Sequence, residues 1–217
     1  SHTYVAWNWK AGNATLASNA FTQGSIASTC SRNTDAGFSI VSWTGTGSIA
    51  TVGHGLSKKP EMILVKRIDN TEPTASLFTV GAGDSVNASS GTFIAYCFHS
   101  VDGYSKVGTY IGNNNDDGTF VYTGFRPKWI MVKSSSVGGN HYDWAIYDTA
   151  RSSYNAVGNV LEANQSQAEV TGTGRGLPID IVSNGFKNRS GYAENNSDKT
   201  YIYIAFAETP FKYSNAR

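Results

Sequence analysis

The sequence predicts an all-β protein, an antiparallel β-sandwich of jelly-roll type that is built from two diverged tandem repeats. Short apolar stretches alternate with turn signals at intervals of about 8–12 residues, and strands do not alternate with helical patterns. The chain has 217 residues, of which 23 are Gly and only 15% are charged. This composition is typical of a protein rich in strands and turns.

The first repeated element is a strand that closes each copy, over residues 92–98 and 200–206, with a third instance at residues 3–9. Side chains alternate between the two faces of a strand. One face carries large apolar residues, for example Ile94 and Tyr96, and we expect this face to point into the core. The other face carries small residues such as Cys97 and Ala205. Cys97 is therefore predicted to be a small buried residue without chemistry.

The second repeated element spans residues 37–45 and recurs at residues 103–112 with one extra residue. A one-residue slip would turn every later side chain to the wrong face of the strand. We therefore expect a β-bulge at Gly108, which aligns Trp43 with Tyr110.

The third repeated element is a turn followed by an apolar strand, over residues 55–66 and 124–133. Pro60 and Pro127 stand near the start of these strands, where a missing N–H does least harm. The apolar runs 62–65 and 129–132 are continuous, which predicts central strands buried on both faces.

These elements divide the chain into a first unit over residues 1–102, with its N-terminal strand shared from a preceding unit, and a second unit over residues 103–217. The chain is expected to be a fragment of a longer protein. The second unit is longer, because residues 134–199 replace a much shorter connection in the first unit. We expect a strand at 142–148 and a short helix within 159–170 in this added stretch.

The residues do not point to catalysis. The chain has no GxSxG, HExxH or P-loop motif, and its four His residues are isolated. Carboxylate pairs such as Asp143 with Asp148, or Asp116 with Asp117, are too common in β-proteins to indicate a glycosidase. The sequence therefore predicts a protein that is not an enzyme and that needs no cofactor.

The sequence also bears on binding of calcium, nucleic acid and membranes. The stretch 113–118 partly matches a calcium loop, but position twelve would be Gly124 instead of the required Glu. A polar hairpin turn without a metal is predicted there. The net charge is +1 without a Lys/Arg cluster, and no apolar run is long enough to span a bilayer. We expect neither nucleic-acid binding nor membrane insertion.

The aromatic residues favour a binding function. The chain has 12 Tyr, 10 Phe and 5 Trp, more than the strand cores consume, and Tyr and Trp beside Asn-rich loops make recognition surfaces. The candidate ligand-binding residues are Tyr142, Asp143, Trp144 and Tyr147 in the added stretch, Asn113, Asn115 and Asp116 in the polar loop, and Trp43 and Tyr110 in the second element. Trp144 could instead be a core residue of an extra strand, in which case Tyr147 is the better candidate for a ligand contact.

The chain also resembles a family of C-terminal domains from bacteriophage tail fibres and virion adhesins of marine and environmental phages. The motifs that carry the resemblance are Gly-Phe-Ser-Ile-Val at 37–41, Gly-His-Gly-Leu at 53–56, Phe-Ile-Ala-Tyr-Cys-Phe at 93–98, Gly-Tyr-Ser-Lys at 103–106, Phe-Arg-Pro at 125–127, Val-Lys at 132–133, Tyr-Asp-Thr-Ala-Arg at 147–151 and the ending 211–217. The chain departs from the family in its first copy, which lacks a Trp-containing strand after residue 66.

The resemblance implies a receptor-binding adhesin on the phage virion. Such a module would form a homotrimer, join the upstream part of the fibre and contact a bacterial surface glycan or outer-membrane receptor. Two alternatives remain open: a structural fibre or decoration domain without a ligand, and a hydrolase of surface polysaccharide.

Overall fold

The computed structural model describes residues 8–12, 15–16, 21–65, 76–136, 142–171, 178–191 and 195–210. The chain divides into two compact units, residues 1–99 and 100–217. The repeat pattern had placed the boundary at 102/103. The N-terminal strand expected at residues 3–9 lies largely outside the described residues, as does the closing motif 211–217.

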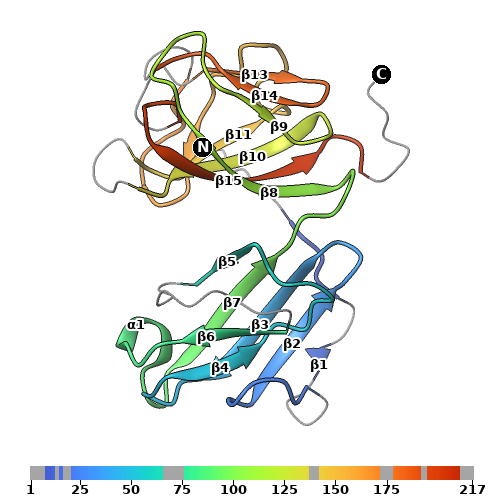
Figure 1. Cartoon of the computed structure of the whole chain (residues 1–217), viewed down its shortest axis with the longest axis vertical. Helices are drawn as coiled ribbons and strands as arrows, with labels where there is room; N and C mark the ends of the chain where they lie inside the picture. Colours follow the sequence, from blue (N-terminus) through green and yellow to red (C-terminus); the bar gives the residue numbers. More distant parts are fainter. Residues whose placement is uncertain are drawn as a thin grey trace, which may run out of the picture. The chain divides into compact units, whose positions relative to one another are not determined.

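The first unit contains a five-stranded antiparallel sheet and a two-stranded sheet (Figure 1). The order in the larger sheet is β1 (Thr15–Leu16), β2 (Ser28–Asn33), β3 (Phe38–Thr44), β7 (Thr92–Phe98) and β5 (Met62–Leu64). The smaller sheet pairs β4 (Ala50–Gly53) with β6 (Leu77–Val80), and a single helical turn, α1 (Asp84–Asn87), follows β6. α1 was not anticipated from the sequence.

The second unit contains a five-stranded and a three-stranded antiparallel sheet. The larger sheet has the order β12 (Leu161–Glu162), β11 (Ala145–Asp148), β10 (Pro127–Ser134), β15 (Thr200–Ala207) and β8 (Ser105–Ile111). The smaller sheet has the order β13 (Ile179–Val182), β14 (Gly185–Asn188) and β9 (Phe120–Tyr122). The predicted all-β, antiparallel sandwich class is confirmed. Among the described helices, none is long and apolar enough to cross a membrane.

Each unit has its own core between its two sheets, and the buried face of the closing strand is the opposite of the one expected. In β7 the core residues are Ala95 and Cys97, whereas Ile94 and Tyr96 are 47% and 38% exposed. The small side chains let Phe78 of the facing sheet reach the centre of the core. The alternation was predicted correctly, but both faces are apolar, so size did not identify the inner one.

In the second unit the closing strand β15 likewise turns Tyr201, Tyr203 and Ala205 into the core. The face that we expected to be buried carries Ile202, Ile204 and Phe206. Ile204 is buried there as well, and Phe206 packs against Trp129. Both faces of this strand are thus covered in part.

The third repeated element behaves differently in the two units. β10 is the central strand of its sheet, and residues 129–132 are buried, as predicted. β5 stands at the end of the strand order, and Ile63 and Leu64 are only partly buried. The prediction of a central strand at 62–65 is therefore wrong for the part of the first unit that the structure describes.

The bulge predicted at Gly108 is wrong, because β8 and β15 pair without a register shift from Ser105 to Ile111. Gly108 lies opposite Tyr203, and a Cβ at this position would be 2.8 Å from the Tyr203 Oη. The glycine makes room for a core aromatic ring. The extra residue falls instead in the turn before β8.

Three strands pair in the same order in each unit, β3-β7-β5 and β8-β15-β10. Trp43 lies opposite Phe93, and Tyr110 lies opposite Tyr201. This order is compatible with two tandem repeats, which stay a prediction.

The long connection of the second unit has one of its two predicted elements. β11 covers the C-terminal part of the strand expected at 142–148. The helix expected within 159–170 is wrong, because this stretch contains β12 and a bridge between Val160 and Val170. His54, one of the four isolated His residues, is completely buried, and its Nδ1 accepts a hydrogen bond from the Leu56 N–H.

Candidate functional site

The outer face of the small sheet in the second unit carries two exposed aromatic rings. Along β9, Phe120 is 46% exposed, Val121 is buried in the core, and Tyr122 is 63% exposed. This is the alternation of a strand with one face on the core and the other in solvent. We call Phe120 and Tyr122 the aromatic platform.

Glycines keep the surroundings of the aromatic platform flat. Gly185 of β14 lies opposite Tyr122, and a Cβ there would be 3.1 Å from Cε2 of Phe120. Gly124 follows β9 in the sequence, and a Cβ at this position would be 3.7 Å from the Tyr122 Oη. Gly124 has φ +86°, a conformation that favours glycine. Both rings therefore lie close to bare backbone.

Two ion pairs flank the aromatic platform. Lys187 lies opposite Phe120, and its Nζ is 2.5 Å from Oδ1 of Asp117. The Arg189 Nε is 3.2 Å from Oδ2 of Asp180, across the β13-β14 pair. The hydrogen bond from Lys187 and its positive charge lower the pKa of the Asp117 carboxyl. Such exposed pairs contribute little to stability, at most about 1 kcal/mol each, but they fix the positions of donors and acceptors.

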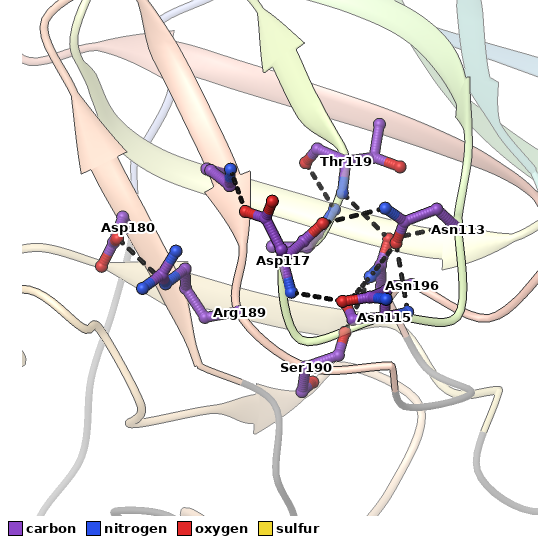
Figure 2. A network of polar contacts seen from close by, with 10 residues as sticks. Asn113, Asn115, Asp117, Thr119, Asp180, Arg189, Ser190 and Asn196 are labelled. Carbon is purple, nitrogen blue, oxygen red and sulfur yellow. Dashed lines mark hydrogen bonds and ion pairs between the residues drawn. The ribbon is translucent and has the colours of Figure 1, made fainter.

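The loop that leads into β9 is held by one buried side chain, Asn196 (Figure 2). Its Oδ1 accepts hydrogen bonds from the backbone N–H groups of Asn113 and Thr119, each at 3.3 Å. Its Nδ2 donates to the Asn113 Oδ1, the Asn115 carbonyl and the Ser190 carbonyl, each at 2.8 Å. Asn196 is completely buried. The two ends of the loop are therefore tied to one point.

The loop also bonds to itself. The Asn113 Oδ1 accepts from the Asn115 N–H at 3.2 Å, and the Asn115 Oδ1 accepts from the Asp117 N–H at 2.8 Å. The Asn113 Nδ2 donates to the Asp117 carbonyl at 2.9 Å. These are the local side-chain bonds that make Asn and Asp frequent in turns. The stretch 113–117 is thus a polar turn, and it delivers Asp117 to Lys187.

Three of the predicted ligand-binding residues belong to this loop. Asn113, Asn115 and Asp116 are exposed. The Asp116 Oδ1 accepts a hydrogen bond from the Gly191 N–H at 3.2 Å. The loop therefore joins the aromatic platform through Asp117, which forms the ion pair with Lys187.

Three other predicted residues lie in the cores, which corrects the expectation that they contact a ligand. Trp43 packs edge-on against Phe78 in the first unit. Tyr110 donates a hydrogen bond from its Oη to the Asn195 carbonyl at 2.5 Å. Tyr147, the residue favoured for a ligand contact, is only 1% exposed, and its Oη accepts from the Asn195 Nδ2 at 3.1 Å. Tyr147 faces the core because β11 turns Ala145 and Tyr147 inward.

The remaining predicted residues form a separate cluster at the start of β11. Asp143 is buried, and its Oδ1 accepts from the Asn164 Nδ2 at 2.6 Å and the Gln165 Nε2 at 2.8 Å. The Lys133 Nζ donates to the Tyr142 carbonyl and lies 6.0 Å from the centre of the Trp144 ring. Asp143 therefore ties the start of β11 to residues 164 and 165.

The sequence analysis missed Phe120, Tyr122 and Lys187. The signal was present as the alternation Phe-Val-Tyr after Gly118-Thr119, a short strand pattern. Periodicity predicts two faces, but it does not say which of them meets the second sheet. Val121 is the inward residue, because it packs in the core beside Phe186, its partner on β14.

The first unit carries a hollow that is another candidate binding surface. It has a volume of about 590 Å³ and lies between strands β5 and β7 and helix α1. Its lining is Leu64, Val65, Asp84, Thr92, Phe93, Ile94 and Tyr96. It has one exposed aromatic ring and one charged side chain. It therefore offers fewer fixed polar groups than the aromatic platform.

Comparison with known proteins identifies one family. A family model described as "Domain of unknown function (DUF7483)" matches residues 1–72 and 67–210. No curated protein and no solved structure matches the chain significantly.

Proposed function

This chain belongs to the family described as a domain of unknown function, DUF7483, and we propose that it is a receptor-binding module of a bacteriophage tail fibre that contacts the host cell through the aromatic platform. The motif resemblance to tail-fibre adhesins supports the phage context. The exposed surface of the second unit supports the binding role.

The observation that carries the proposal is the exposure of Phe120 and Tyr122 side by side on one sheet face. Isolated apolar residues are common on protein surfaces, but neighbouring exposed aromatics beside fixed polar groups mark interaction sites. Aromatic rings bury much apolar area with few rotatable bonds, which makes them frequent anchors in binding surfaces. In the free protein both aromatic rings are exposed to water, which is unfavourable. A ligand that covers the rings is therefore favoured.

The carboxylates beside the aromatic platform support binding without hydrolysis. A glycosidase needs one carboxyl group with a raised pKa to protonate the leaving oxygen. The pKa of Asp117 is lowered by Lys187, in the opposite direction. Asp180 is held by Arg189. We therefore propose that the module binds its receptor without cutting it and needs no cofactor.

The proposed setting is the virion, with the module at the end of a fibre. It would be joined to the upstream part of the fibre and assembled as a homotrimer, which would repeat the aromatic platform three times. Several weak contacts on one rigid particle then add to a strong attachment.

The experiment is adsorption of the labelled protein to a panel of bacterial strains from aquatic and environmental samples. Wild type is expected to bind some strains. Tyr122→Ala and Phe120→Ala should each weaken binding by about tenfold or more, equivalent to 1.4 kcal/mol. The matched control is Tyr154→Ala, because Tyr154 is an exposed aromatic residue outside the strands of this sheet. Its binding should not change.

Two outcomes would contradict the proposal. If wild type binds none of the strains, a structural decoration domain is the better description. If Tyr96→Ala abolishes binding and Tyr122→Ala does not, the receptor surface is the hollow on the first unit.

A further inference from the structure

We infer that the ligand of the aromatic platform is an uncharged stretch of glycan, with two consecutive pyranose rings on Phe120 and Tyr122. This inference rests on the proposed receptor-binding function and specifies the chemical class of the receptor. It follows from the balance of charge, the nature of the two rings, their spacing and the rigidity of the loop.

The two ion pairs beside the aromatic platform carry no net charge. Lys187 is bound by Asp117, and Arg189 is bound by Asp180. An anionic sugar would have to displace a carboxylate from its cation, and the displaced carboxylate would then repel it. A cationic ligand meets the same obstacle at Asp117 and Asp180. A neutral hydroxyl group, by contrast, can accept from Lys187 or donate to Asp117 while the pair stays intact.

Phe120 has no polar atom, so it can contribute only an apolar contact. The partner of its ring must therefore present an apolar face together with polar groups at its edge. A pyranose ring has this form, because its axial C–H groups point to the faces and its equatorial hydroxyls point outward. Tyr122 adds a hydroxyl at the edge of its ring, in the manner typical of Tyr in recognition surfaces.

The two rings are one alternate position apart on β9. Residues i and i+2 of a strand are separated by about 7 Å. This separation suits successive rings of one chain better than a single ring, which would cover one aromatic side chain alone. Ion pairs at the Phe120 end and bare glycine backbone at the Tyr122 end make the two subsites different.

A protein receptor fits this surface less well. Stable protein interfaces bury about 800 Å² on each partner and need a broad apolar centre. Here the neighbours of the two rings are glycine and charged pairs. Asn196 holds the loop 113–119 in place before a ligand binds. Less conformational entropy is therefore lost on binding, and a small ligand has less to offset. Weak ligands such as neutral sugars profit most from such preorganisation.

The test is binding of the full chain to an array of neutral and acidic oligosaccharides, together with adsorption to a strain that wild type binds. The array should give binding to neutral oligosaccharides of at least two rings, lost by about tenfold or more in Tyr122→Ala. Tyr154→Ala serves again as the matched control. Adsorption should change less than about twofold when salt rises from about 0.1 M to 1 M, although the Debye length falls from about 10 Å to 3 Å.

A charge-free variant sharpens the result. In Asp117→Asn with Lys187→Gln, net charge is kept and both side chains can still exchange hydrogen bonds with hydroxyls. We expect this variant to keep binding within about threefold and to remain independent of salt.

The outcomes separate this inference from the proposed function. Binding only to acidic sugars, or a steep loss of adsorption with salt, would overturn the uncharged ligand while leaving a receptor-binding module in place. The same holds if adsorption depends on Tyr122 but no oligosaccharide is bound and protease treatment of the cells abolishes it. Adsorption that Tyr122→Ala and Phe120→Ala leave unchanged would overturn both.

Discussion

Asn196 and Asn113 bond to each other reciprocally: the Asn196 Nδ2 donates to the Asn113 side-chain oxygen, and the Asn196 Oδ1 accepts the Asn113 backbone N–H. The two residues are far apart in the sequence, one after β8 and the other before β15. Because the Asn196 side chain is completely buried and makes five hydrogen bonds, it anchors the exposed loop 113–119 to the folded body of its unit.

Replacing Asn196 should therefore destabilise the protein more than replacing any residue of the loop itself. Asn196→Ala leaves buried donors and acceptors without partners, and we expect the free energy of unfolding to fall by about 3 kcal/mol or more. Asn115→Ala loses the bond to the Asp117 N–H on an exposed side chain and should cost about 1 kcal/mol or less. Urea denaturation of both variants checks this. Equal losses would show that Asn196 does not anchor the loop.

Gly185 is predicted to be irreplaceable for the position of β9. A Cβ there would press into the backbone carbonyl of Val121, which cannot yield as a flexible side chain would. Gly185→Ala should push β9 away from β14, lower the free energy of unfolding by about 2 kcal/mol and weaken receptor adsorption. Ser183→Ala, in the exposed turn just before β14, is the control and should change neither quantity. A neutral Gly185→Ala variant would contradict the close contact between these strands.

The strands themselves were largely predictable, because alternation of side chains is a local property of the sequence. The inner face of β7 was not predictable, because both faces of this strand are apolar. One face carries Ile94 and Tyr96, and the other carries Phe93, Ala95 and Cys97. The choice depends on which face the second sheet covers, which is a tertiary property. Gly108 is a similar case, since the chain needs a glycine there only because Tyr203 lies opposite.

The candidate site was predictable only in part for the same reason. The polar loop 113–117 was identified from its composition, which specifies a turn locally. Tyr147 and Tyr110 were chosen for their aromatic rings, but they are core residues bonded to Asn195. Tyr122 has the same chemistry and is exposed because it lies on the outer face of the small sheet, opposite to the face of Val121. Sequence alone does not distinguish these tyrosines.

A pair of isoleucines in the second unit tests the location of its core. Ile130 of β10 is 1% exposed, whereas Ile111 at the end of β8 is 68% exposed. Ile130→Ala should lower the free energy of unfolding by about 3 kcal/mol, from lost burial and the cavity that remains. Ile111→Ala should change it by about 0.5 kcal/mol or less. Thermal unfolding of both variants measures the difference, and comparable losses would be inconsistent with the core described above.

Alkaline pH should destabilise the first unit through its buried thiols. Burial raises the pKa of Cys97 from 9.0 to about 12 and that of Cys30 from 9.0 to about 11. Well below pH 9 both thiols are protonated whether the chain is folded or not, so their contribution to stability is fully present. Between pH 9 and 12 the unfolded chain releases these protons and the native protein holds them, which favours unfolding as the pH rises. Cys97→Ala should show a shallower loss of stability over this range in urea titrations at each pH.

The same burial predicts that neither thiol reacts in the native protein at pH 8. The thiolate is the reactive form, and a buried thiol with a raised pKa provides very little of it. Cys97 packs on the inner face of β7, and the Cys30 thiol points to the His54 carbonyl at 3.6 Å. Iodoacetamide should therefore label no cysteine in the folded protein within an hour or so and both cysteines in concentrated urea, as counted by mass spectrometry. Rapid labelling of native Cys97 would place it outside the core, and the buried face of β7 would then be the one that carries Ile94 and Tyr96.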